Sequence, residues 1–320
     1  MKKIILFFCA CTLLSTFTGC SKKKSEQRTV RIGIQPSAAF IPLYITRYSG
    51  ELEKALAKEN VNVIWQDFES GPPMNESLAA DLTDIGVIGD VPTVVALNNS
   101  TPMKLVGIPA RGPNAYALLA SYDDSSVNTF TDLKGKRIAT VFGSTGHNFT
   151  KKLLENNNLS FSDINFMNIS ASACEEVLNT KMADAVVIWE PNVTRLVDKK
   201  AAKIIATGDK TNLRGTNGFV VREEFLSANK DIIATIIENY TRASKNISSL
   251  NPSILSMLAN VLKINEEQVI SISQKYSYFS EITNDDLKSL QDTIKFLVSI
   301  NNLPVEYNIE DKVEKSYFLK

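Results

Sequence analysis

Short apolar runs alternate with amphipathic stretches along most of this chain. The runs at 29–34, 61–65 and 84–88 have the length and the flanking turn residues of strands. The segments between them repeat apolar residues at helical spacing, and a glycine or proline marks several of their ends. This alternation of strands and helices predicts a parallel sheet covered by helices, and therefore an α/β fold.

The same alternation continues in the middle of the chain and then stops. Further strands are predicted at 105–108, 115–120, 137–141, 164–169, 185–189, 203–206 and 218–221. From residue 223 onward the pattern is helical, with no clear new strand. We therefore expect two lobes, with lobe 1 built from 29–115 and 218–320 and lobe 2 from 116–217. Two crossings side by side, near 114–117 and 216–220, would form a hinge, and hinge closure around a ligand is a common switching mode.

Two segments about one hundred residues apart repeat the same device. Each has a helix, a short apolar strand and a turn in which a carboxylate, Asp90 or Glu190, lies just before a proline-containing helix start. Proline suits the first turn of a helix. The repeat would place a carboxylate and a helix N-terminus at the carboxyl edge of a strand in each lobe, where α/β sheets bind ligands. Coincidence among common residues is the alternative.

The N-terminus has the features of an export signal. A basic start is followed by the apolar run 4–17, which is shorter than the roughly 20 residues that span a bilayer. The run ends in Thr18-Gly19-Cys20, which resembles a bacterial lipoprotein cleavage box. We expect a signal peptide at 1–19, lipidation of Cys20 and a polar tether at 20–28, so that the mature protein is exported and held on a membrane by its lipid. An uncleaved anchor is the alternative.

Charge and composition narrow the functional classes. The formal net charge is +0, and no basic field or nucleic-acid motif is present, so no nucleic-acid partner is expected. His147 is the sole histidine, which argues against metal sites built on several imidazoles, and no phosphate or dinucleotide loop occurs; no metal or cofactor is expected. Cys9 and Cys11 fall in the signal and Cys20 would carry lipid. Cys174 would then be alone, without an intramolecular disulfide.

The loop at 143–148 is the strongest candidate for an anion site. It follows a strand, is rich in glycine and hydroxyls and opens a helix, whose free N–H groups and dipole favour negative charge. We expect Ser144, Thr145, Gly146 and His147 to hold a sulfonate, nitrate, carboxylate or phosphate. The alternative is an ordinary capped helix. Ser144 and His147 lack the surroundings of a nucleophile pair, so a hydrogen-bonding or packing role for His147 is preferred.

Other candidates follow from the topology, because they sit on turns at the same sheet edges. These predicted ligand-binding residues are Gln35, Ser37, Ser70, Gly71, Gly89, Asp90, Trp189, Glu190 and Asn217. Asp90 and Glu190 could instead be simple helix caps, and a buried Glu190 would need a partner. Trp189 is expected as a flat wall of the cleft, with a core position as the alternative.

Several of these motifs together resemble the solute-binding proteins of the taurine, aliphatic-sulfonate and nitrate type, which are receptors of ABC importers. The matching stretches run in order through nearly the whole mature chain: Arg31-Ile32-Gly33-Ile34-Gln35, Phe68-Glu69-Ser70-Gly71-Pro72, Asp84-Ile85-Gly86, Gly89-Asp90-Val91-Pro92, Leu133-Lys134-Gly135-Lys136, Gly143-Ser144-Thr145-Gly146-His147-Asn148 and Ile188-Trp189-Glu190-Pro191. The chain departs from the family pattern at Asp81 and Lys181, where glycine is usual, and at Thr93, where a second proline is usual.

This resemblance implies a type II periplasmic-binding-protein fold, with each lobe a mostly parallel sheet flanked by helices and the C-terminal helices on lobe 1. It implies a monomeric, non-enzymatic receptor that delivers a small sulfonate-like solute to a permease and an ATPase. A thiamine-pyrimidine precursor stacked on Trp189, nitrate or bicarbonate are alternative ligands. An enzyme of the related pyrimidine-synthesising branch would need a cofactor lysine and further histidine or cysteine residues. A sensor or adhesin that no longer serves transport is a further alternative.

Overall fold

The computed structural model describes residues 26–123, 126–278 and 281–317. The predicted signal peptide, Cys20 and most of the predicted tether lie outside these described residues. Arg28, expected at the end of the tether, is the first residue of a strand, where its backbone pairs beside Val61. No helix in the described ranges combines the length and the apolar character needed to cross a bilayer.

Lobe 1 is built on a five-stranded sheet with the strand order β2-β1-β3-β11-β4. Its strands are β1 (Arg28–Ile34), β2 (Val61–Asp67), β3 (Ile85–Gly89), β4 (Met103–Gly107) and β11 (Asn217–Arg222). β1 pairs in parallel with β2 and β3, whereas β11 runs antiparallel between β3 and β4. The predicted α/β alternation is therefore confirmed, and a strand encoded far along the chain lies inside this sheet.

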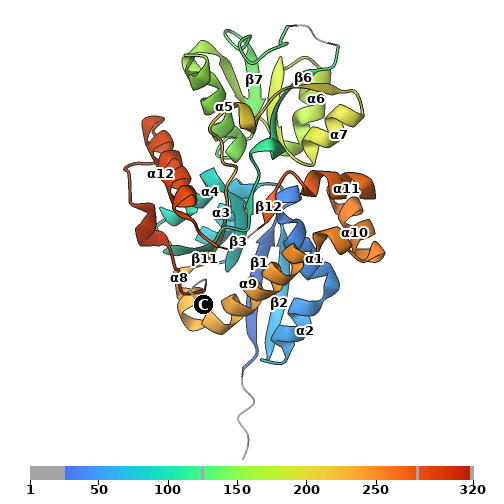
Figure 1. Cartoon of the computed structure of the whole chain (residues 1–320). Coiled ribbons are helices and arrows are strands. Elements are labelled where there is room, and N and C mark those ends of the chain that lie inside the picture. Colours follow the sequence, from blue (N-terminus) through green and yellow to red (C-terminus); the bar gives the residue numbers. More distant parts are fainter. Residues whose placement is uncertain (1–25, 124–125, 279–280, 318–320) are drawn as a thin grey trace, which may run out of the picture.

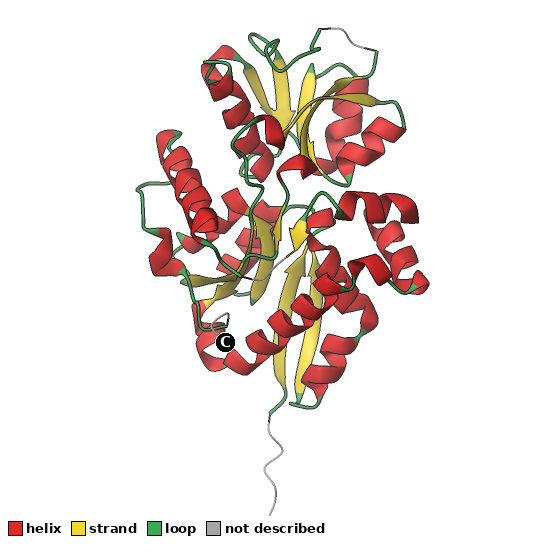
Figure 2. Cartoon of the chain, viewed as in Figure 1, coloured by secondary structure: helices red, strands yellow, loops and turns green. Residues whose placement is uncertain are grey.

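Lobe 2 repeats this plan with the strand order β10-β6-β9-β7-β8. Its strands are β6 (Tyr116–Ser121), β7 (Arg137–Thr140), β8 (Asn165–Asn168), β9 (Ala185–Trp189) and β10 (Ala202–Thr207). β7 pairs in parallel with β8 and β9, and β6 runs antiparallel between β9 and β10. Figure 2 shows the two sheets one above the other, each between helices. This is the predicted periplasmic-binding-protein fold.

Helices cover both faces of each sheet (Figure 1). In lobe 1 they are α1 (Ile41–Ser49), α2 (Glu51–Ala57), α3 (Gly71–Ala79), α4 (Asp90–Leu97), α8 (Glu223–Ala228) and α9 (Lys230–Lys245). In lobe 2 they are α5 (Thr145–Asn156), α6 (Cys174–Asn179) and α7 (Asn192–Asp198). Because helices cover both faces, β3 and β9 are buried along their whole lengths, which explains their continuous apolar runs.

The C-terminal helices α10 (Pro252–Leu262), α11 (Glu266–Ser273) and α12 (Asn284–Ser299) pack on lobe 1, where α10 meets α1 and α12 meets α4. The expectation of no strand beyond residue 223 was wrong in one detail. The two-residue strand β12 (Ser277–Tyr278) pairs with β5 (Ala110–Arg111). Such a short pair carries no hydrophobic period that a sequence could display.

Among the described residues there are also seven short 3-10 turns: η1 (Ala38–Phe40), η2 (Pro113–Ala115), η3 (Phe161–Asp163), η4 (Ala171–Ala173), η5 (Gly208–Lys210), η6 (Ile247–Ser249) and η7 (Ile309–Lys312). Two of them, η2 and η5, lie on the segments that cross between the lobes. These segments run side by side, since Arg111 forms an antiparallel bridge with Thr216 and the Gly112 N–H donates to Gly215 O at 3.1 Å.

The repeated device of the sequence has a matching structure in both lobes. Arg31 in the middle of β1 donates its backbone N–H to Asp84 Oδ2 at 2.8 Å, and Arg137 in β7 does the same to Asp184 Oδ2, also at 2.8 Å. The residues three positions before these aspartates, Asp81 and Lys181, have φ values of 59° and 56° and end the preceding helices in the left-handed conformation. Two of the three departures from the family pattern, Asp81 and Lys181, thus lie at helix ends, away from the cleft.

Candidate ligand-binding site

A polar cavity lies where the carboxyl edges of the two sheets face each other. Ten residues line it, namely Gln35, Ser37, Gly71, Gly89, Pro92, Tyr116, Ser144, Thr145, Trp189 and Asn217. Both lobes contribute, and Tyr116 and Asn217 begin the strands that follow the two crossings. We call this space the ligand cavity. Its free volume is about 20 Å³, which is enough for one or two water molecules. The lobes are thus closed on each other.

The structure brings eight of the thirteen predicted ligand-binding residues to this cavity: Gln35, Ser37, Gly71, Gly89, Ser144, Thr145, Trp189 and Asn217. Tyr116 and Pro92 also line it and were not predicted. Tyr116 opens an apolar strand and therefore looked like a core residue. Its wall position follows only from the crossing of the chain at that point.

Gln35 presents an unmet polar group to the cavity. It follows β1, and its Oε1 is buried without a hydrogen-bond partner. A buried amide oxygen without a donor is costly, so this position favours a ligand that supplies one. The neighbouring Ser37 is already engaged, because its Oγ accepts from Ala39 N at 3.3 Å and caps η1.

The N-terminus of α5 forms the lobe 2 side of the cavity. Ser144 Oγ donates to Val141 O at 2.6 Å and accepts from Gly146 N at 3.1 Å, so this hydroxyl caps its own helix. Thr145 Oγ1 points at lobe 1, where a Cβ on Gly89 would overlap it. Glycine at position 89 is therefore what allows α5 and β3 to approach so closely. Gly146 has a packing role, because an added Cβ would come within 2.5 Å of Thr140 Oγ1.

His147 lies outside the cavity lining, within a cluster of phenylalanines. Its ring is 5.2 Å from Phe142, 5.0 Å from Phe166 and 5.5 Å from Phe296 between centroids. Burial lowers the pKa of His147 to about 4, so the ring is neutral near pH 7. The Gly143 N–H donates to Nδ1 at 3.3 Å. The imidazole therefore packs and orients the loop, which is the role preferred above over a nucleophile pair.

Asp90 is buried beside the cavity and is already bonded to protein groups. Its Oδ2 accepts from Asn148 Nδ2 of lobe 2 at 2.6 Å, and its Oδ1 accepts from Val91 N at 2.7 Å. Burial raises the pKa of Asp90, against hydrogen bonds from Thr145 and Asn148. Helix α4 begins at Asp90 itself, one residue after its N-cap Gly89, so Asp90 is not the cap that the sequence suggested.

Glu190 is fully buried and has the partner that its burial requires. Its Oε1 pairs with Lys275 Nζ at 2.5 Å and accepts from Thr194 Oγ1 at 3.0 Å, while Oε2 accepts from Thr194 N at 3.0 Å. The last bond satisfies a free N–H in the first turn of α7, which begins after Pro191 at Asn192. The helix-cap alternative describes Glu190 better than direct ligand contact. Ser70 is likewise outside the lining, as the buried N-cap residue of α3.

Contacts between the lobes surround the ligand cavity. Besides the pairs Asp90–Asn148 and Glu190–Lys275, Ser172 Oγ of lobe 2 donates to Glu69 Oε1 of lobe 1 at 2.7 Å. Ala38 N of lobe 1 donates to Glu190 O at 3.3 Å. These contacts exist only while the lobes are together, and they fix the closed arrangement.

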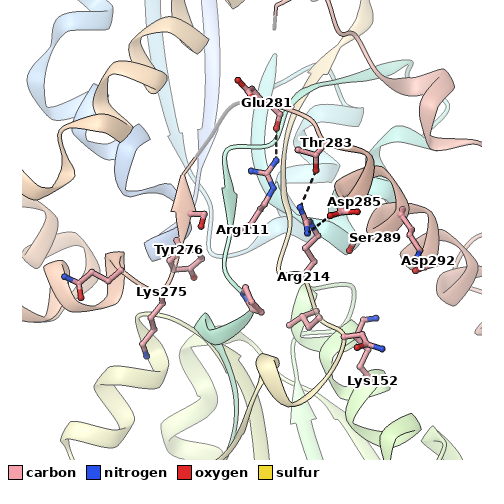
Figure 3. Close-up of a pocket in the computed structure, with 16 residues that line it drawn as sticks. Arg111, Lys152, Arg214, Lys275, Tyr276, Glu281, Thr283, Asp285, Ser289 and Asp292 are labelled. Atoms are coloured by element: carbon pink, nitrogen blue, oxygen red, sulfur yellow. Dashed lines mark hydrogen bonds and ion pairs between the residues drawn. The ribbon is translucent and has the colours of Figure 1, made fainter.

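A second and larger space lies on the face of the molecule where the chain crosses between the lobes (Figure 3). This hinge groove has a volume of about 940 Å³ and is open to solvent. It is lined mostly by charged and polar side chains, among them Arg111, Lys152, Arg214, Lys275 and Asp285. Its charges are of both signs; Asp285 is largely exposed, whereas Arg111 and Arg214 are mostly covered. Within the described ranges, no group of three or more His, Cys, Asp or Glu side chains could hold a metal ion.

Known proteins similar to this chain include proteins named for binding aliphatic sulfonates or taurine. A Bacillus subtilis protein whose assigned name is that of an aliphatic sulfonates-binding protein is 27% identical over 94% of this chain and 90% of its own length. The taurine-binding periplasmic protein of Escherichia coli is 23% identical over 84% of this chain and 88% of its own.

Comparison with solved structures identifies the fold. The alkanesulfonate-binding protein from Xanthomonas axonopodis pv. citri, solved with bound MOPS, superimposes with a TM-score of 0.81 at 24% identity, over 90% of this chain and 98% of that one. The sequence profile described as NMT1/THI5 like matches residues 57–249, well over half of the chain. The protein belongs to the NMT1/THI5-like family and has the periplasmic-binding-protein fold.

Proposed function

We propose that this protein is the extracytoplasmic substrate-binding protein of an ABC importer and captures a small sulfonate-like solute, such as taurine or an alkanesulfonate, between its lobes. The observation that carries the proposal is the ligand cavity itself. It is small and polar, both lobes line it, and the N-terminus of α5 opens into it at Ser144 and Thr145. A helix N-terminus with hydroxyls beside it suits an anionic group.

The remaining wall favours an anion that also carries a hydrogen-bond donor. Gln35 offers an unpartnered amide oxygen, whereas the carboxylates of Asp90 and Glu190 are bonded to protein groups. An aminosulfonate has an anionic head and an ammonium donor at its other end. Trp189 and Tyr116 supply flat apolar walls along the cavity. A solute larger than one or two waters can enter only if the lobes separate, and the two crossings, at residues 111–115 and 208–216, provide the hinge.

A binding role is favoured over catalysis by the state of the two reactive side chains in lobe 2. Burial raises the pKa of Cys174 to about 12, so this thiol is a poor nucleophile. His147 is neutral and enclosed by aromatic rings, outside the cavity lining. Neither is placed to act on a bound solute, so we propose a receptor and not an enzyme.

Export and anchoring are part of the proposal. We propose that the chain is cleaved before Cys20, lipidated there and tethered to a bacterial membrane as a monomer, where it delivers its solute to a permease and an ATPase. The apolar run 4–17 and Gly19-Cys20 support this. Mass spectrometry of the membrane-extracted protein would detect a diacylated N-terminal peptide beginning at Cys20. Loss of this lipidated peptide in the Cys20→Ala variant is expected, and an unmodified N-terminus on the membrane-extracted wild-type protein would contradict the anchor.

Ligand identity is tested by a thermal-shift screen followed by calorimetry, on mature protein with Cys20 replaced. A ligand that binds only the folded state raises the apparent stability. The panel holds taurine, alkanesulfonates, nitrate, bicarbonate and a thiamine-pyrimidine precursor. We expect stabilisation by a sulfonate. Stabilisation by the pyrimidine alone, stacked between Trp189 and Tyr116, would keep the receptor role and replace the solute, and no stabilisation by any of them would contradict the proposed function.

A further inference from the structure

Asp286, in the first turn of α12, is bonded to both chain segments that cross between the lobes. Arg111 of the first crossing donates from Nε to Asp286 Oδ1 at 2.7 Å, and Arg214 of the second crossing donates from Nε to the same oxygen at 2.7 Å. Arg111 also reaches Oδ2 through Nη2 at 2.5 Å. Figure 3 shows Arg111 and Arg214 side by side between the lobes, beside the start of α12. One carboxylate therefore ties two distant parts of the chain to one helix.

The acceptor has to be an ionised carboxylate. Thr283 donates its N–H and its hydroxyl to Oδ2 at 2.8 and 2.7 Å, so Asp286 accepts five hydrogen bonds in all. Burial alone would raise the pKa of Asp286, but the hydrogen bonds from Arg111, Thr283 and Arg214 outweigh it and lower the pKa to about 2. An amide in its place has one acceptor oxygen and no charge to offset two neighbouring guanidinium groups.

The backbones of the two crossings are also in close contact next to these arginines. Gly215 has a φ of 64°, and an added Cβ there would lie 2.7 Å from the Gly112 backbone, so the two crossings touch through glycines. A Cβ on Gly112 would overlap the ring of Tyr276. In the first crossing, residues 112–115 connect the Asp286 contact to lobe 2, and in the second crossing residues 208–213 do so. These segments contain the short turns η2 and η5.

We propose that Asp286 is a positioning residue for lobe closure: it fixes both crossings to lobe 1 and confines the hinge bend to residues 112–115 and 208–213. The bend then lies on the lobe 2 side of α12, and closure brings Thr145 onto Gly89 along one path. This inference rests on the proposed function, because closure around a solute is what the positioning serves. Asp286 is not among the residues that line the ligand cavity, and its hydrogen bonds go to Arg111, Arg214 and Thr283, so it would act on binding through the hinge.

The test measures the distance between the lobes with spin labels at Lys58→Cys and Lys134→Cys, which are exposed positions of lobes 1 and 2. Asp286→Asn is compared with its matched control Asp285→Asn, which removes the same charge one residue away. The side chain of Asp285 is largely exposed, and its Oδ2 lies 3.7 Å from Arg214 Nη1, which is farther than the hydrogen bonds of Asp286. We expect Asp286→Asn to broaden the distance distribution of the ligand-free protein, with Asp285→Asn like wild type. The affinity for the best ligand of the panel should fall by roughly fivefold or more, which is the scale of site-to-site coupling.

Asp286→Glu keeps the charge and should restore a narrower distribution in part, which a general loss of stability would not do. If Asp286→Asn does not fold, Arg214→Gln removes one of the two arginine contacts at a partly exposed site and should broaden the distribution in the same way. A wild-type distance distribution together with wild-type affinity in a folded Asp286→Asn or Arg214→Gln variant would overturn the inference. The distance measurement needs no ligand, so failure of the whole panel to bind would contradict the proposed function alone.

Discussion

Lys275 of lobe 1 and Glu190 of lobe 2 form an ion pair across the closed cleft, with Nζ and Oε1 2.5 Å apart. Glu190 has no exposed surface, while the Lys275 side chain retains about a third of its exposure. Separation of the lobes would leave the carboxylate with Thr194 as its remaining hydrogen-bond partner. The pair therefore stabilises the closed state more than the open one, and it does so beside the ligand cavity without touching it.

The first prediction concerns this pair. Lys275→Met should weaken ligand binding by about tenfold, equal to roughly 1.4 kcal/mol, chiefly by faster dissociation. The unfolding midpoint should change little, because each lobe keeps its own core. Calorimetry and stopped-flow dissociation provide the measurement. Lys288→Met is the control, since Lys288 also lines the hinge groove but lies on α12 and not beside Glu190. Equal losses in both variants would show that the general charge of the groove is responsible.

Gly89→Ala should prevent full closure. The new methyl group would overlap Thr145 Oγ1, while each lobe folds normally. We expect a loss of affinity of more than tenfold and a larger radius of gyration in the presence of ligand. Adding Thr145→Ala removes the overlapping oxygen, so the double variant should close again and recover the compact form. A Gly89→Ala protein that is as compact as wild type with ligand would contradict this account of the cleft.

Direct contacts give the third prediction. Trp189→Ala and Thr145→Ala should each weaken binding without unfolding the protein, because both residues line the cavity. Truncation of a buried aromatic wall costs more than loss of one hydroxyl, so Trp189→Ala should have the larger effect on affinity. Calorimetry checks the affinity and circular dichroism the fold. Unchanged affinity in both would place the ligand elsewhere.

The pH dependence follows from His147. Its pKa is about 4 in the folded protein and about 6.5 in a solvated chain, so the unfolded state binds more protons between these values. This residue's contribution is complete above pH 6.5 and is lost as the pH falls toward 4, up to roughly 3 kcal/mol at 1.36 kcal/mol per pKa unit. Urea unfolding at pH 7.5, 6, 5 and 4 measures it. His147→Phe should unfold with a weaker pH dependence over this range, and an unchanged slope would assign the effect to other groups.

The layout of the fold could be predicted from the sequence because periodic patterns carry it. The apolar runs of β3 and β9, and the strand–helix order around them, report burial between helices directly. The candidate site was predictable where a residue sits on a turn at a sheet edge, as Gln35 and Ser144 do. Topology alone places such residues at the cleft.

The positions that were missed depend on how the two lobes meet. Asp90 and Glu190 sit at the expected edge, yet their oxygens are taken by Asn148 and Lys275, each from the other lobe. Those partners are more than fifty residues away in the chain, and no local sequence pattern predicts them. Tyr116 was missed for the same reason, since its cavity role comes from where the chain crosses and not from its neighbours in sequence.

The place of β11 inside the first sheet also determines an order of assembly. β11 separates β3 from β4 and is encoded after all five strands of lobe 2. A chain that emerges from its N-terminus can complete lobe 2 from contiguous residues, whereas lobe 1 must wait with an unpaired gap until residue 222 has appeared. Lobe 2 can therefore form first as the chain emerges, whereas lobe 1, which begins the sequence, is completed last. The unfinished sheet of lobe 1 is then the part that needs protection from aggregation in the interval.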